Sequence, residues 1–198
     1  NTATCKAQVQ VVDNLAPAIN CPTNFTALAG ANCTTLPSAI SALTLTMVSP
    51  SSPLTAPGQY KDNCAVASIT YSLSGANFTG AATGAYPIPN TVNFKAGTTP
   101  VTYTFTDASG NAAVCSFNVS VSDLTAPVFS PCPSNTVTIA DDTIKVNANL
   151  GGCTATASWA AITATDNCTV SPVVSTNHTS GSFFPFGNTL VSYTATDA

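Results

Sequence analysis

The eight cysteines of this 198-residue chain are its most reactive side chains, and their spacing limits the chemistry that they can perform. No two of them form a Cys-x-x-Cys pair, and the chain has a single histidine, whereas zinc sites usually combine closely spaced cysteines with histidines. Disulfide formation in an oxidising compartment is therefore the favoured chemistry, and zinc binding is the weaker alternative.

The eight aspartates are the only acids, since the chain contains no Glu, and four Lys are its only bases. Asp13, Asp62, Asp123 and Asp166 stand at linkers and at Asp-Asn-Cys turns, where their oxygens could gather around calcium. Aspartate is also common in turns because its carboxylate accepts hydrogen bonds from nearby backbone N–H groups. We favour turn capping, and therefore expect no cofactor and no metal, with calcium as the alternative.

Catalytic and nucleic-acid-binding chemistry find little support. His178 has no acid near it in the sequence and is expected to be a solvent-exposed loop residue. Neither Gly-x-Ser-x-Gly nor His-Glu-x-x-His occurs, so we expect no enzyme. Charged residues make up 6% of the chain, without a basic patch, which disfavours nucleic acid as a partner. No apolar run is long enough for a membrane span.

The element that organises the chain is a predicted β-hairpin over residues 97–122. Residues 101–106 alternate apolar and polar side chains, and residues 115–122 do so again after the turn at 107–111. A period of two on both sides of a turn with Gly and Asn predicts two paired strands with one buried face. A short linker and the dipeptide Cys132-Pro133 follow.

The same stretch occurs a second time, divided between the ends of the chain. Residues 189–198 match the first strand, and residues 1–13 match the second. The equivalent core positions are Cys5 and Cys115, Ala7 and Phe117, Val9 and Val119, and Val11 and Val121. We therefore expect a mature or excised piece that begins with the closing strand of a neighbouring domain.

The domain boundaries follow from this repeat. Residues 1–13 are the closing strand of a neighbouring domain, residues 18–123 form the first domain, and residues 128–198 form a second that lacks its last strand. The first carries a Pro-rich insertion at 49–58. We expect strands near 25–28, 43–48, 69–73 and 92–95 and, in the second domain, near 136–139, 144–148, 158–164 and 190–197. Many short strands with Gly, Pro and Asn turns favour an all-β, immunoglobulin-like sandwich, with Trp159 in its core.

Several motifs resemble the hyalin repeat (HYR) family, an immunoglobulin-like module of extracellular and bacterial surface proteins. They are residues 101–111, Cys115-Ser116-Phe117, Ala126-Pro127, Cys132-Pro133 and Asp166-Asn167-Cys168. The resemblance covers nearly the whole chain and implies an extracellular, cell-surface location. It also implies three disulfides, Cys21–Cys115, Cys33–Cys64 and Cys153–Cys168, and pairs Cys132 with Cys5 of a neighbouring copy.

An open edge in the second domain could be completed in two ways. Residues 1–13 could follow residue 198 in a long tandem array, or each subunit could donate this strand to the next copy of itself, which gives a head-to-tail filament. We therefore expect a structural repeat of an extracellular filament or stalk. The alternative is an adhesin that binds a glycan or a surface through loops 49–58 or 86–90.

Six Asn-x-Ser/Thr sequons fit a secreted glycoprotein. They are Asn24, Asn32, Asn77, Asn118, Asn167 and Asn177.

Overall fold

The computed structural model describes all residues except 76, 131–142 and 198. It divides into an N-terminal unit, residues 1–123, and a C-terminal unit, residues 124–198. The expected all-β fold is confirmed, because the described helical residues are confined to two short 3-10 turns, Pro37–Ala39 and Ser41–Leu43. No helix among the described residues is long and apolar enough to cross a membrane.

The N-terminal unit is built around a five-stranded sheet with the order β2-β11-β10-β6-β8, accompanied by two three-stranded sheets, β1-β5-β4 and β3-β9-β7. Its strands are β1 (Ala18–Ile19), β2 (Phe25–Leu28), β3 (Thr34–Thr35), β4 (Thr46–Met47), β5 (Gln59–Lys61), β6 (Val66–Leu73), β7 (Phe78–Thr79), β8 (Thr83–Ala85), β9 (Asn93–Lys95), β10 (Gly97–Asp107) and β11 (Ala112–Ser122).

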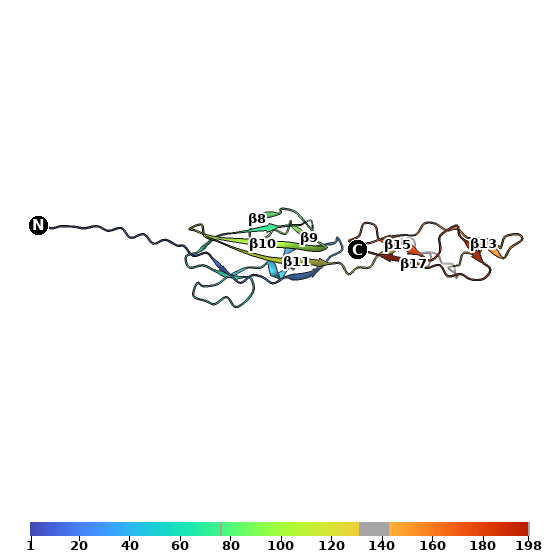
Figure 1. Cartoon of the computed structure of the whole chain (residues 1–198), viewed down its shortest axis with the longest axis horizontal. Coiled ribbons are helices and arrows are strands. Elements are labelled where there is room, and N and C mark those ends of the chain that lie inside the picture. Colours follow the sequence, from blue (N-terminus) through green and yellow to red (C-terminus); the bar gives the residue numbers. More distant parts are fainter. Residues whose placement is uncertain (76, 131–142, 198) are drawn as a thin grey trace. The chain divides into compact units, whose positions relative to one another are not determined.

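The predicted hairpin forms the centre of this sheet (Figure 1), where β10 and β11 run antiparallel along their whole length. Tyr103 pairs with Cys115 across the hairpin and with Tyr71 on β6. The alternation of the sequence becomes an alternation of burial, since every second residue is buried from Thr99 to Asp107 and from Cys115 to Val121. The period of two therefore specified both the strands and the face that they bury.

The buried face of the hairpin packs on residues from the smaller sheets and the 3-10 turns. Tyr103 and Phe94 are both fully buried. The Tyr103 ring lies 5.8 Å from that of Phe117 and 5.9 Å from that of Tyr86, measured between centroids. Its hydroxyl donates a hydrogen bond to the Leu43 carbonyl at 3.2 Å. One aromatic side chain thus links the main sheet to the layer opposite.

The C-terminal unit repeats three strand pairs of the N-terminal unit in the same register. Its strands are β12 (Val128–Ser130), β13 (Thr154–Thr156), β14 (Thr163–Thr165), β15 (Val173–Thr176), β16 (Phe183–Pro185) and β17 (Tyr193–Thr196). The pair Val128–Thr165 corresponds to Ala18–Lys61. The pair Thr154–Pro185 corresponds to Thr34–Lys95. The pair Tyr193–Thr176 corresponds to Tyr103–Tyr71. The equivalent strands of the two units are therefore β17 and β10, and β15 and β6.

Three strand predictions are corrected. Residues 43–48 contain the end of a 3-10 turn and the two-residue β4, residues 144–148 form no strand, and residues 158–164 contribute only the start of β14. The predicted strand at 136–139 lies outside the described residues. Trp159 is partly buried, with its ring 6.0 Å from that of Phe184 and its Nε1 donating to the Tyr193 hydroxyl at 2.6 Å.

Candidate functional site

Residues 1–12 match a core strand in sequence, yet they pair with no strand that the structure describes, and all of them are exposed. Figure 1 shows this segment extended away from the sheets of its unit. Val9 is 85% exposed and Val11 is 92% exposed. The matching residues on β11, Val119 and Val121, are 0% and 4% exposed. The segment therefore has a strand pattern without the neighbour that would bury it.

The C-terminal unit offers an edge of the complementary kind. In the N-terminal unit, β10 is flanked by β6 on one edge and by β11 on the other. Among residues 124–130 and 143–197, the equivalent strand β17 pairs with β15 alone. Its second edge therefore has no partner within the described part of this unit, and a further strand could pair with the backbone N–H and C=O groups there.

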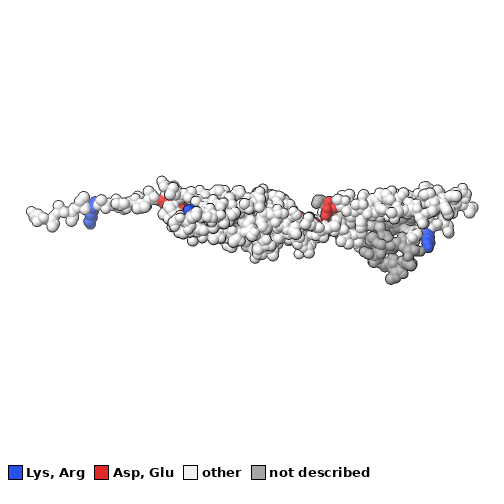
Figure 2. All heavy atoms as spheres, turned by 90° about the horizontal axis from the view of Figure 1, so that it is seen from below, with Lys and Arg blue, Asp and Glu red and all other residues white. Residues whose placement is uncertain are grey.

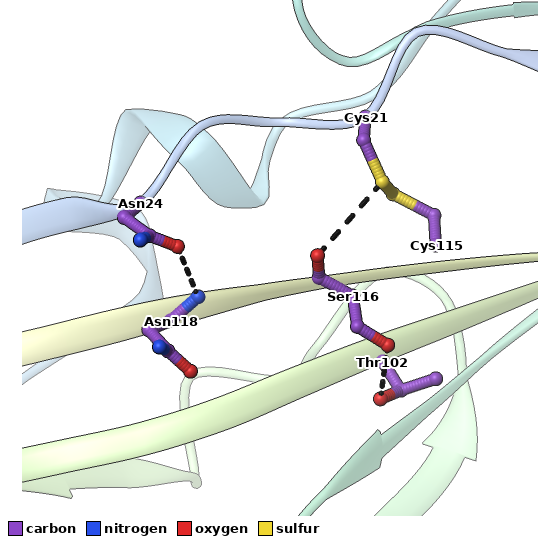
Figure 3. Close-up of a disulfide and its surroundings, with 6 residues drawn as sticks. All are labelled: Cys21, Asn24, Thr102, Cys115, Ser116 and Asn118. Carbon is purple, nitrogen blue, oxygen red and sulfur yellow. Dashed lines mark hydrogen bonds between the residues drawn. A yellow bond between two sulfur atoms is a disulfide. The ribbon is translucent and has the colours of Figure 1, made fainter.

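The Cys21–Cys115 disulfide that the family resemblance implies is present in the structure (Figure 3), with Cα atoms 5.7 Å apart and a sequence separation of 94 residues. It joins the segment after β1 to the buried face of β11. Nearby, the Asn118 backbone N–H donates to Oδ1 of Asn24 at 2.9 Å. In the chain-entropy model, a loop of this length contributes about 4–5 kcal/mol to stability.

The Cys33–Cys64 bridge is a wrong prediction, since Cys64 carries a free thiol while Cys33 is disulfide-bonded. The reason is the length of β10. The Cys33 carbonyl accepts a hydrogen bond from Ala96, next to the first residue of β10, whereas Cys64 precedes β6 at the opposite end of β10. Eleven residues of strand span about 33 Å, and a disulfide needs Cα atoms within about 7 Å.

The Cys153–Cys168 bridge is also a wrong prediction. Cys153 is free and exposed while Cys168 is disulfide-bonded. The Cys153 carbonyl accepts a hydrogen bond from Phe186. Cys153 therefore lies beside Phe186, which precedes β17. Cys168 lies close to Asp166, whose carboxylate is beside that of Asp197, and Asp197 follows β17.

The expected Cys5–Cys132 bridge stays a prediction. Cys5 is free and exposed in the structure, whereas Cys132 lies outside the described residues.

An acidic cluster, Asp13, Asp62 and Asp107, lies where the linker after residues 1–12 meets the hairpin turn. Ligand atoms of its three carboxylates are all within 4.8 Å of one another, and Asp62 and Asp107 are buried. Asn111 ties the cluster together, because its Nδ2 donates to Oδ2 of Asp107 at 2.7 Å and to the Asp13 carbonyl at 3.3 Å. These oxygens could hold a hard cation.

Sequence reasoning had considered Asp13 and Asp62 as calcium ligands, and the structure brings these two together. The sequence pattern indicates only a turn at Asp107, so this third member of the cluster was missed. Asp107 does cap the turn, since its Oδ1 accepts the N–H groups of Ser109 and Asn111 at 2.9 and 2.8 Å. The signal that could have found it is the Thr-Asp-Ala that ends both copies of the first hairpin strand, at 106–108 and 196–198.

The electrostatics of the cluster follow from its hydrogen bonds. The Asn63 side chain and the Leu15 backbone N–H donate to Asp13 and lower the pKa of its carboxyl. A hydrogen bond to Asp13 raises the pKa of the Cys64 thiol, with further contributions from desolvation and from the nearby negative charges. Asp13 is therefore ionised, and the adjacent thiol is kept protonated.

The predicted glycosylation sites differ in exposure. Asn24, Asn32, Asn118 and Asn177 are exposed, whereas Asn77 and Asn167 are partly buried. The Nδ2 of Asn77, the atom that would carry a glycan, donates to the Thr98 carbonyl at 2.9 Å. Asn118 keeps the outward orientation expected from the strand pattern.

The loops considered for adhesion are held by internal contacts. Within 49–58, the Ser52 carbonyl accepts a hydrogen bond from Nζ of Lys61 at 2.6 Å. A depression of about 210 Å³ beside Pro57 is smaller than the roughly 300–1,000 Å³ of typical ligand pockets.

His178 is partly buried, with its ring 5.4 Å from that of Phe184, rather than fully exposed. Figure 2 shows a surface with few charged side chains.

Comparison with known proteins gives a consistent result. The model of the HYR domain family matches residues 83–121 and 122–198. The chain is 38% identical over 104 residues to a rat protein named "Sushi, von Willebrand factor type A, EGF and pentraxin domain-containing protein 1". The matched region covers 52% of this chain and 3% of the rat protein.

Two sea-urchin proteins named hyalin are also similar. That of Strongylocentrotus purpuratus is 40% identical over 108 residues, covering 53% of this chain and 8% of its own length. The hyalin of Lytechinus variegatus is 36% identical over 107 residues, and the matched region covers 52% of this chain and 19% of that hyalin. The chain thus spans less than a fifth of each of these relatives. No solved structure matches it.

Proposed function

Because the chain belongs to the HYR domain family, we propose that it is a structural repeat of an extracellular surface filament or stalk, joined head-to-tail by strand complementation. One observation carries the proposal. The exposed segment at residues 1–12 has the pattern of β11, and β17, the equivalent of β10, has an edge without a partner among the described residues. The absence of catalytic motifs and the sparse charge fit a structural role.

The hairpin predicts the register of the complemented edge. In β10 and β11, Cys115 pairs with Tyr103 and Val121 pairs with Gly97. By equivalence, Cys5 of the donor would pair with Tyr193 of the acceptor, and Val11 with Gly187. Val9 and Val11 would then be buried, and burial of each contributes about 1.5–3 kcal/mol relative to exposure.

The same register determines which thiols would meet. Gly187 follows Phe186, whose N–H donates to the Cys153 carbonyl at 2.8 Å. On the donor, Asn63, the neighbour of Cys64, donates to Asp13 at 2.8 Å, two residues beyond Val11. Cys64 of the donor would therefore come close to Cys153 of the acceptor. A disulfide oxidant such as glutathione disulfide could join the two thiols, taking up their two protons and two electrons.

The closing strand could come from the same polypeptide or from another copy, and these two sources give different native assemblies. In a tandem array the strand follows from the same polypeptide, and in a filament of separate subunits it comes from another copy. For the present chain both versions predict self-association, because its own residues 1–13 supply the strand that another copy accepts.

The test is the mass of the assemblies across a dilution series, measured by size-exclusion chromatography with light scattering. The wild-type chain should form chains of copies that grow with concentration. The double variant V9D/V11D should weaken association at least a hundredfold, because it would bury two carboxylates. The matched control Q8D/Q10D adds the same charges on the outward face and should still assemble. A wild-type chain that stays monomeric, or equal effects of the two variants, would overturn the proposal.

A further inference from the structure

We propose that the acidic cluster of Asp13, Asp62 and Asp107 is a calcium-binding site that fastens the entering linker to the hairpin turn. The site lies within the N-terminal unit and does not depend on assembly. It joins three segments that are far apart in sequence: the linker, the Asp-Asn-Cys turn and the end of β10.

Asp62 provides the observation that points to a ligand. Its side chain is 8% exposed, and its Oδ2 accepts the backbone N–H groups of Cys64 and Ala65, both at 2.9 Å. Its Oδ1 is fully buried and accepts no hydrogen bond within the described part of the chain. A buried carboxylate oxygen without a donor is costly, since it has lost its water without replacement. A bound cation would compensate that loss.

Among the described residues, no basic side chain is seen to compensate the charge of the cluster. The hydrogen bonds described for Asp13 and Asp107 come from the side chains or backbone of neutral residues. Lys61 is next to Asp62 in sequence, but its Nζ donates to the Ser52 carbonyl in the Pro-rich loop instead. Three carboxylates, two of them buried, therefore lie within 4.8 Å of one another with no lysine described as their ion-pair partner.

The chemistry of the donors favours calcium over other metals. Ca²⁺ binds six to eight oxygens, commonly several carboxylates and backbone carbonyls, in flexible geometry. Zinc prefers nitrogen and sulfur ligands in protein sites. Mg²⁺ demands a near-ideal octahedron and usually keeps several waters. An all-oxygen set with three carboxylates is the kind of site that calcium occupies.

The arrangement recurs in the C-terminal unit, where Asp166 and Asp197 stand at the positions of Asp62 and Asp107. Their ligand atoms also lie within 4.8 Å of each other. Oδ2 of Asp166 accepts the N–H groups of Cys168 and Thr169, both at 2.8 Å, as Oδ2 of Asp62 does in its own turn. In sequence, Asp123 takes the place of Asp13. Both units thus build the same carboxylate turn.

The test uses the full chain and its D62N variant, each freed of metal with a chelator and then titrated with CaCl₂ by calorimetry. Asn keeps an oxygen that can accept the Cys64 and Ala65 N–H groups, so the turn should remain folded. The wild-type chain should bind one calcium more than D62N, with a dissociation constant on the order of 10⁻⁴ M. D166N is the matched variant in the other unit and should leave the Asp62 site intact.

Thermal unfolding separates this role from turn capping alone. Without calcium, D62N should melt at the wild-type temperature or above, because it removes a buried, uncompensated charge. Saturating calcium should raise the melting temperature of the wild-type N-terminal unit by about 5 °C or more, and that of D62N far less. No heat and no shift for the wild type up to about 10 mM CaCl₂, or an equal response of D62N, would overturn the site.

Discussion

Tyr103 is the residue on which the N-terminal core depends most directly. Its side chain is fully buried, three aromatic rings lie within 6.5 Å of its ring, and its hydroxyl donates to the Leu43 carbonyl. Desolvation raises the pKa of this phenol far above its usual range, so it remains a donor in the folded protein. A single hydroxyl therefore satisfies a carbonyl in the opposing layer.

Y103F should lower the free energy of unfolding by about 1–2 kcal/mol, because the Leu43 carbonyl would lose its donor inside the core. Chemical denaturation of the two proteins measures the difference. Y71F is the control, since the hydrogen bond described for the Tyr71 hydroxyl, to the Ala81 carbonyl, is long at 3.5 Å. A smaller loss for Y103F than for Y71F would contradict this account of the core.

The raised pKa gives this prediction a pH signature. Unfolded tyrosine ionises near pH 10, whereas Tyr103 stays protonated in the folded state. The unfolded state therefore releases a proton that the folded state keeps, and the wild type loses stability as the pH rises above about 10. Y103F lacks this proton, so its deficit should shrink there.

Single residues were only partly predictable from sequence. Val101, Tyr103 and Phe105 are buried as their alternation indicated. Asp107 was missed because a carboxylate at a turn usually caps it, and whether it also meets two other carboxylates depends on contacts distant in sequence. The partners that the family resemblance implied for Cys64 and Cys153 were also wrong, because both thiols are free in the structure.

At the scale of elements, the Cys21–Cys115 disulfide fastens β11 to the segment after β1. The C21A/C115A variant should lose about 2–5 kcal/mol of stability, measured by thermal or chemical unfolding. C64A is the control, since Cys64 is free and exposed, and its effect should be within about 0.5 kcal/mol. Equal stability of C21A/C115A and the wild type would refute a structural role for the disulfide.

The long elements were predictable and the short ones were not. Strands β10 and β11 each carry eleven residues, enough alternating positions for the period to stand out. β4 has two residues, and its pairing with β5 depends on tertiary contacts rather than on a local pattern. The described part of the C-terminal unit contains only such short pairs, so its boundaries were predicted less well.

At the scale of the whole molecule, the repeat was the most informative signal in the sequence. It predicted the equivalence of β10 and β17, which the matching registers of their partner strands support. A repeat relates positions within a chain, but it does not say which chain supplies the strand at an open edge. The chain that supplies this strand has to be identified by experiment.

The most direct test of strand complementation maps disulfides between copies. An equal mixture of ¹⁴N- and ¹⁵N-labelled chains would be assembled with glutathione disulfide, digested without reduction and analysed by mass spectrometry. Our account predicts mixed-label peptides that join Cys64 to Cys153 in the wild type and in Q8D/Q10D, but not in V9D/V11D. Thiols that stay unjoined in the wild type, or mixed-label peptides equally abundant in V9D/V11D, would contradict it.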